Sequence, residues 1–231
     1  MTGKEEKTIF TNKGPLKTNT LKNQAYQQIK DAILYRRLKL DVIYSQDDIC
    51  QSLGISRTPV REALIELQTK GFVTFVRGRG FMIKPLSRKE ALDIVEMRKG
   101  IEMFGAELAA SRITDEQLVE MRGLLNQMSV ETDWKDSVAM YKLDYAFHEK
   151  IFEATGNVWM MHTNKVLREN FLRVETQSAF AKKVDANHVL KEHEAVLLAL
   201  EERNPAKARK AMEKHMKMTY TRTVNKILEQ Q

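Results

Sequence analysis

The chain places its helix start and stop signals so close together between residues 45 and 67 that only two short helices and a tight turn fit. Ser45 is followed three residues later by Asp48, a spacing that resembles a capping box. Gly54 is a typical residue to follow the last turn of a helix. Pro59 then falls within the first turn of the next helix, where its missing N–H costs no hydrogen bond. We therefore expect a helix-turn-helix.

The second helix of this pair has two different faces. Its apolar side is expected to comprise Val60, Ala63, Leu64 and Leu67. Arg57, Thr58 and Arg61 lie on the other side near its N-terminus, and two arginines four residues apart share a face. Such a helix can enter the DNA major groove, where arginine donates paired hydrogen bonds to guanine. The alternative, that these arginines are merely solvated, remains open.

A basic hairpin is expected after the two helices. Residues 72–84 (FVTFVRGRGFMIK) show two β-branched and aromatic runs around Arg77, Gly78 and Arg79. The glycine allows close approach, and the arginines suit the narrow, electronegative minor groove of DNA. Together with an amphipathic helix expected over 21–37, the pattern predicts a winged helix-turn-helix.

All of the excess positive charge lies in the first third of the chain. Residues 1–85 carry 15 Lys and Arg against 8 Asp and Glu, whereas residues 86–231 carry 23 of each. A basic module joined to a neutral one indicates that the first meets a polyanion such as DNA. A basic solvated surface without a partner is the alternative. We expect a flexible basic tail over 1–19 and a DNA-binding domain over 20–85.

From Ser87 onward the pattern is helical. Six amphipathic segments are expected, over residues 88–110, 114–130, 133–153, 156–181, 185–202 and 205–229. Asn204 followed by Pro205 is a typical helix start, and Gly156 separates the third segment from the fourth. The fold class is therefore mainly α, with residues 86–231 forming an antiparallel all-α bundle.

Composition narrows the cellular setting. The chain has no run of about 18 apolar residues that could span a bilayer. Its first residues lack the apolar segment of a signal peptide. The single cysteine, Cys50, excludes an intramolecular disulfide and is most simply a small core residue. We expect a cytoplasmic protein with no membrane partner.

Four polar residues stand on the apolar faces of the predicted bundle helices. They are Asp144, His148, His193 and His215. An unpaired buried polar group costs about 1–3 kcal/mol, so such residues need partners. A lone inward histidine is usually a satisfied core residue, but one carboxylate and three imidazoles together suit a divalent transition metal, zinc or nickel.

The remaining polar residues of interest divide into surface and interior candidates. His162 and His188 do not fall on the same faces and are interpreted as surface residues. Arg98 shares an apolar face, so it either pairs internally with Glu102 or awaits a carboxylate ligand. Thr163 and Asn170 fall on the stripe of Trp159, Val166, Leu167 and Val174 and are candidate effector contacts, an internal hydrogen-bond network being the alternative.

These residues carry two family resemblances. The run LGISRTPVREALIELQTKGFV (53–73), with SRTPVREAL intact at 56–64, resembles the DNA-binding domain of GntR-type bacterial transcription regulators. The resemblance implies that Arg57, Thr58 and Arg61 contact bases or phosphates and that Gly78 lies at the wing tip. Many members carry a basic residue where this chain has Asp47, so no such contact is carried over to that position.

The second resemblance concerns the helical part. Asp144-x3-His148, His193 and His215, with FHEKIFEATGN at 147–157, are similar to the FCD ligand-binding domain that follows GntR-type DNA-binding domains. This implies that the four residues hold a metal beside a small organic acid. Six helices resemble the shorter VanR-type subgroup.

The sequence thus predicts a homodimeric, metal-containing transcription regulator, most simply a repressor. It would bind a short palindromic DNA operator and respond to a small carboxylate effector, with residues 86–231 binding metal and effector and forming the dimer. Two alternatives remain at this point. One is a ligand-independent DNA binder with a structural metal, and the other is a metal-dependent hydrolase, for which the sequence offers no convincing general base.

Overall fold

The computed structural model describes residues 20–130, 137–177 and 186–228, so the predicted tail over 1–19 lies outside the described residues. The chain divides into two compact units. In the described part, residues 20–31 and 42–82 form the first unit, and residues 32–41 and those from 83 onward form the second.

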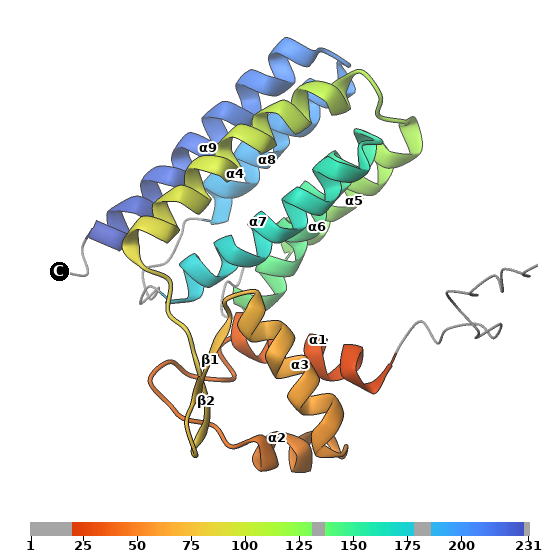
Figure 1. The fold of residues 1–231 in the computed structure, drawn as a ribbon. Helices are drawn as coiled ribbons and strands as arrows, with labels where there is room; N and C mark the ends of the chain where they lie inside the picture. Colours follow the sequence, from red (N-terminus) through yellow and green to blue (C-terminus); the bar gives the residue numbers. More distant parts are fainter. Residues whose placement is uncertain (1–19, 131–136, 178–185, 229–231) are drawn as a thin grey trace, which may run out of the picture. The chain divides into compact units, whose positions relative to one another are not determined.

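Three helices and a hairpin make up the first unit (Figure 1). The helices are α1 (Leu21–Leu34), α2 (Gln46–Leu53) and α3 (Arg57–Thr69). The predicted end signals operate at both ends of α2, because Ser45 Oγ accepts a hydrogen bond from the Asp48 amide at 3.0 Å and Gly54 ends the helix at φ 65°. Ser56 occupies the N-cap position of α3, but its side chain makes no capping hydrogen bond.

The apolar side of α3 is buried as predicted. Val60, Ala63, Leu64 and Leu67 are each fully excluded from solvent. Two strands follow, β1 (Val73–Val76) and β2 (Gly80–Ile83), and the turn between them contains Gly78 at φ 71°. The segment before α2 also pairs with β2 through Tyr44 and Phe81, an isolated antiparallel bridge that the sequence did not predict.

Gly80 explains how this bridge is possible. Its φ is 129°, and a Cβ at this position would lie 2.1 Å from the Tyr44 carbonyl oxygen. Any side chain here would displace the backbone of the Tyr44 segment.

The three helices and the hairpin of the first unit together form a winged helix-turn-helix.

The second unit contains the six predicted helices (Figure 1). They are α4 (Arg88–Ala110), α5 (Asp115–Val130), α6 (Ser137–Ala154), α7 (Val158–Gln177), α8 (Ala186–Glu201) and α9 (Pro205–Leu228). The predicted residues 133–136, 178–181, 185 and 229 lie outside the described residues. Helix α4 packs on α9 and α7, and α5 packs on α6 and α8, which gives the expected all-α bundle.

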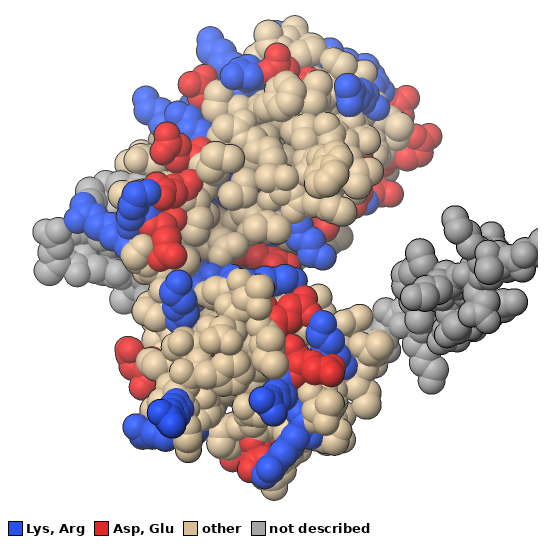
Figure 2. All heavy atoms as spheres, viewed as in Figure 1, with Lys and Arg blue, Asp and Glu red and all other residues tan. Residues whose placement is uncertain are grey.

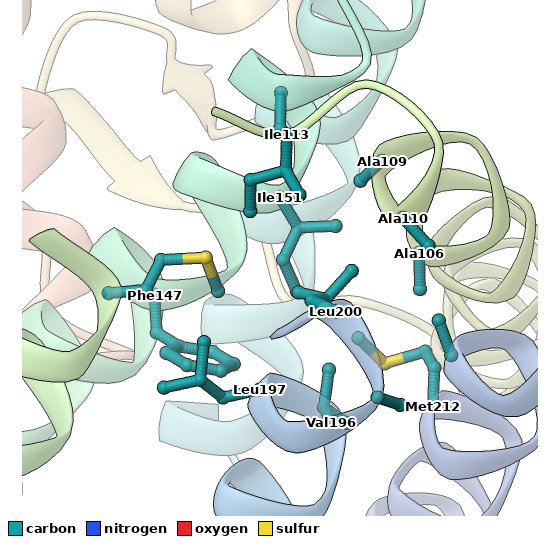
Figure 3. Packing of buried hydrophobic residues seen from close by; sticks show 14 of the residues in the cluster. Ala106, Ala109, Ala110, Ile113, Phe147, Ile151, Val196, Leu197, Leu200 and Met212 are labelled. Atoms are coloured by element: carbon teal, nitrogen blue, oxygen red, sulfur yellow. The ribbon is translucent and has the colours of Figure 1, made fainter. Parts of the chain in front are cut away.

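The core of the bundle is aliphatic and aromatic. Phe147 and Ile151 of α6 meet Leu197 and Leu200 of α8 and small side chains of α4, among them Ala106 (Figure 3). Phe147 also stacks edge-on against His193, with ring centroids 4.8 Å apart. The histidine His193 therefore lies next to the apolar core. Among the described residues, no helix is long and apolar enough to cross a membrane.

Candidate metal centre and nucleic-acid interface

The residues predicted to contact DNA are all exposed. Arg57, Thr58 and Arg61 lie in the first two turns of α3, which begins at Arg57. Arg77, Gly78 and Arg79 form the exposed turn of the hairpin. Figure 2 shows that basic side chains over this unit alternate with acidic ones, so the surface is not uniformly positive.

One acidic residue is bound directly to a predicted DNA-contacting arginine. Asp47, in the first turn of α2, accepts two hydrogen bonds from Arg57, one from Nε at 2.7 Å and one from Nη2 at 2.8 Å. Both side chains are largely exposed. The sequence flagged Asp47 only as an unusual residue and did not predict this pair.

The four predicted metal-binding side chains meet inside the bundle, although they come from three helices. Asp144 and His148 belong to α6, His193 to α8 and His215 to α9. The three imidazoles are buried, and one potential ligand atom from each of the four residues lies within 4.8 Å of the others. The contact between His193 Nε2 and Asp144 Oδ1 is 3.1 Å, and the Nε2 atoms of His193 and His148 are 3.4 Å apart.

Two carboxylates orient two of these imidazoles. Glu102 of α4 lies 2.7 Å from His148 Nδ1, and Glu192 of α8 lies 2.9 Å from His215 Nδ1. Each imidazole that donates from Nδ1 keeps a lone pair on Nε2, the atom that faces the cluster. The Nε2 atom of His215 is buried and has no hydrogen-bond partner among the described residues. It is therefore available as a ligand.

Burial shifts the titration of these groups. It lowers the pKa of His148 to about 3 and, together with the nearby His193, the pKa of His215 to about 4. Burial alone raises the pKa of Glu102, but contact with His148 and the charges of Arg98 and Arg168 outweigh it and bring that pKa to about 2. His148 and His215 are thus neutral near neutral pH, the state in which an imidazole coordinates a metal, and Glu102 is ionised.

Two arginines complete the buried charge network. Arg98 is almost fully buried, donates from Nε to Glu102 Oε1 at 3.2 Å and lies over the Phe171 ring. Arg168 donates from Nη2 to Asp144 Oδ2 at 2.6 Å, which leaves Asp144 Oδ1 facing the histidines. The internal pairing expected for Arg98 is therefore present, and its partner is Glu102.

The predicted orientation of Thr163 and Asn170 is wrong. Thr163 is exposed and donates to its own helix at the Trp159 carbonyl oxygen, while Asn170 is half-buried and donates to the Val166 carbonyl oxygen. Trp159 and Val166 of the predicted stripe are 81% and 59% exposed, so this part of it faces outward, whereas Val174 at its far end is buried. Helix α7 has two apolar stripes, and the sequence pattern did not show which of them packs on the bundle.

The inward face of α7 instead carries Asn164 and Arg168, which the sequence analysis missed. Both side chains are buried, one helical turn apart. Asn164 Oδ1 and Arg168 Nη1 have no hydrogen-bond partner among the described residues. Their spacing from Met160 and Phe171, both buried, is the sequence signal that could have identified this face.

The cluster fits a divalent transition metal. In a tetrahedral zinc site two ligand atoms lie roughly 3.4 Å apart, so the four ligand atoms, which lie within 4.8 Å of one another, would have to approach by at most about 1.4 Å. A histidine that binds a metal commonly donates its other ring N–H to a carboxylate, as His148 and His215 do here. His162 and His188 are exposed, as predicted, and lie outside the cluster.

A winged helix-turn-helix joined to a helical bundle with a buried polar site is the architecture of a two-domain transcription regulator. Residues 21–83 match the family model for bacterial regulatory proteins of the gntR family, and residues 93–218 match the FCD domain. The chain belongs to the GntR family and carries an FCD domain, so it is a DNA-binding transcription regulator and not an enzyme.

This chain is similar to several known proteins. The HTH-type transcriptional regulator LutR of Bacillus subtilis is 30% identical, over 81% of this chain and 92% of LutR. The HTH-type transcriptional repressor RspR of Escherichia coli is 25% identical over 90% of both chains. Among solved structures, E. coli McbR/YncC covers 90% of this chain with a TM-score of 0.81 at 18% identity, a likeness of fold.

Proposed function

We propose that this chain is a metal-dependent repressor whose affinity for a short palindromic operator changes when a small organic acid binds in the FCD domain. The observation that carries the proposal is the convergence of Asp144 with three buried imidazoles, two of them oriented by carboxylates. Zinc and nickel both suit this donor set. When bound, the ion would supply a Lewis-acidic centre for a carboxylate.

The charge count around the cluster supports an anionic effector. Asp144 and Glu102 are balanced by Arg98 and Arg168, so the innermost groups are neutral without a metal. A divalent ion adds two positive charges at a buried site, where uncompensated charge is costly. A carboxylate bound beside the ion offsets half of this excess and a dicarboxylate all of it, and the buried Arg98 guanidinium is the candidate anchor.

Asn164 refines the class of acid. Its Oδ1 and Arg168 Nη1, one turn apart on the inward face of α7, have no hydrogen-bond partner among the described residues, although Nη1 lies 3.7 Å from Glu102 Oε1. An acid with a hydroxyl next to its carboxylate would offer each of them a partner. Small hydroxy acids are therefore the effectors we favour, with Arg98, Arg168 and Asn164 in place of Thr163 and Asn170.

The proposed dimer uses the outer face of α4 and α7. These two helices pack together, and both expose large apolar side chains: Met97 is 58% exposed, Phe104 48%, Trp159 81% and Val166 59%. Gly100 of α4 has open space above it, which permits close approach of another helix. Figure 2 shows a broad uncharged area over this part of the bundle. Two-fold symmetry of the protein would match the two half-sites of a palindrome.

The mechanism is one of linkage. An acid that binds one arrangement of the dimer better than another shifts the spacing of the two α3 helices. A coupling free energy of about 1–3 kcal/mol changes operator affinity roughly 5–150-fold. Repression relieved by the acid is the mode we propose, and the similar protein RspR, a transcriptional repressor, is consistent with it.

A thermal-shift screen tests the effector site. Metal-loaded wild-type protein is compared with matched acids that differ in one hydroxyl, lactate against propionate and malate against succinate. We expect a hydroxy acid to raise Tm in wild type and in His162→Ala, which alters an exposed histidine, but not in His193→Ala. In Asn164→Leu the preference for the hydroxylated acid should fall about tenfold. No shift with any acid in metal-loaded protein would contradict the proposal.

A structural metal is the second candidate. Asp144 and three histidines already supply four ligands, the number of a closed tetrahedral zinc site. In that case metal removal would unfold the bundle, and no acid would shift Tm. Nickel, which is bound in geometries with more than four ligands, would leave positions for the acid. The same screen therefore separates the two candidates.

A further inference from the structure

We infer that Asp47 is a positioning residue for DNA recognition, which holds the guanidinium of Arg57 in one orientation so that its free edge reads a guanine. This inference rests on the proposed operator binding by α3. It concerns an acidic side chain on a surface that must approach an anionic polymer, where a carboxylate would ordinarily weaken binding.

The hydrogen-bond geometry assigns the two edges of the Arg57 guanidinium to different roles. The edge formed by Nε and Nη2 is occupied, since it donates to Oδ1 and Oδ2 of Asp47 at 2.7 and 2.8 Å. A guanidinium has five N–H donors, so Nη1 and the second N–H of Nη2 remain. These form the end-on edge that can pair with guanine O6 and N7. One arginine can thus bind Asp47 and a base at the same time.

The location of the pair favours recognition over stability. The Arg57 side chain is 76% exposed and the Asp47 side chain 62%, and an exposed ion pair contributes little to the free energy of folding. Asp47 belongs to the first turn of α2 and Arg57 is the first residue of α3, so the pair fixes the side chain at the N-terminal end of the recognition helix. A long, flexible arginine that is already oriented loses less conformational entropy on binding.

The competing role for Asp47 is electrostatic. A carboxylate that only repels phosphates, or that occupies Arg57 until DNA displaces it, would weaken binding to every sequence alike. Positioning makes the opposite prediction, because it strengthens binding to one base in each half-site. Asp48 provides a matched control, since it carries the same charge at the next position of the same helix turn and is also exposed.

The experiment is an in vitro selection with the full chain and a randomised duplex library, repeated with Asp47→Ala, Asp48→Ala and Arg57→Ala. Wild type and Asp48→Ala should select the same half-site. Asp47→Ala should lose the preference for guanine at one position per half-site, the position that Arg57→Ala also loses. On the selected operator, Asp47→Ala should bind about tenfold or more weakly, while its affinity for a scrambled duplex stays equal or rises.

Each outcome bears on a different claim. Combining Asp47→Ala with Arg57→Ala should cost no more operator affinity than Arg57→Ala alone. If Asp47→Ala tightens binding to operator and scrambled duplex by the same factor, or keeps every base preference, the positioning role is refuted while operator binding stands. If wild type selects no sequence, the proposed function fails first.

Discussion

His148 Nδ1 and Glu102 Oε2 lie 2.7 Å apart in the interior of the bundle, with both side chains fully buried. This pair joins α6 to α4 and fixes which nitrogen of His148 faces the cluster. Its role can be separated from simple stability, because Gln at position 102 keeps a hydrogen-bond acceptor but removes the charge.

Glu102→Gln is expected to weaken metal binding by about 10–100-fold, the usual effect of removing a carboxylate that supports a metal-bound histidine. Isothermal titration of metal-free protein with zinc measures the affinity. Glu149→Gln, an exposed change on the same helix as His148, is the control and should bind zinc normally. Equal affinity in both variants would show that Glu102 does not support a metal ligand.

The metal-free protein should lose stability as pH falls below about 6.5. The folded-state pKa values of His148 and His215, about 3 and about 4, lie below the ordinary value of 6.5, so the unfolded chain takes up more protons in that range. Stability therefore rises with pH up to about 6.5, by at most about 1.4 kcal/mol per pH unit for each histidine. Urea unfolding between pH 4.5 and 7.5 tests this, and a flat profile would contradict the burial of neutral imidazoles.

Arg98→Lys should weaken effector binding about tenfold or more and leave zinc affinity within a few-fold, because lysine keeps the charge but not the forked donor geometry. Acid titrations of metal-loaded protein followed by Tm provide the readout. If acid binding is unchanged while zinc affinity falls, Arg98 supports the metal site through Glu102 and does not anchor a carboxylate.

Phe104→Glu is expected to raise the dissociation constant of the dimer by at least about tenfold, because it places a charge in the proposed apolar interface. Sedimentation velocity over a range of concentrations measures the change. Val119→Glu is the control, since Val119 of α5 is 73% exposed and lies outside that face. A dimer equally stable in both variants would place the interface elsewhere.

Local signals predicted much of this molecule. Ser45 and Gly54 lie at the two ends of α2, as predicted, because helix capping depends on residues adjacent in sequence. Pro205 is the first residue of α9 for the same reason. The convergence of Asp144 with three histidines was also predictable, since each stands on an apolar face. The Arg98–Glu102 pair within α4 was predicted for the same reason. In contrast, the contacts of Glu102 with His148, of Glu192 with His215 and of Asp47 with Arg57 depend on which helices become neighbours, and periodicity within one helix carries no such information.

Helix α7 shows the limit most clearly. Its apolar residues form two stripes, and the sequence analysis interpreted the one with Trp159 and Val166 as the inward face. The structure buries Met160 and Phe171 with Asn164 and Arg168 instead, and leaves Trp159 exposed. An apolar stripe at helical spacing can serve a core or an interface between chains, so burial within one chain could not be inferred from it.

The most direct test of the account is the operator affinity of zinc- or nickel-loaded protein, measured by fluorescence anisotropy with and without the acid that most raises Tm. We predict that the acid weakens operator binding about 5–150-fold in wild type and has no effect in His193→Ala. Identical operator affinity with and without an acid that demonstrably binds the bundle would contradict the proposed mechanism, because the effector site and the DNA-binding domain would then be uncoupled.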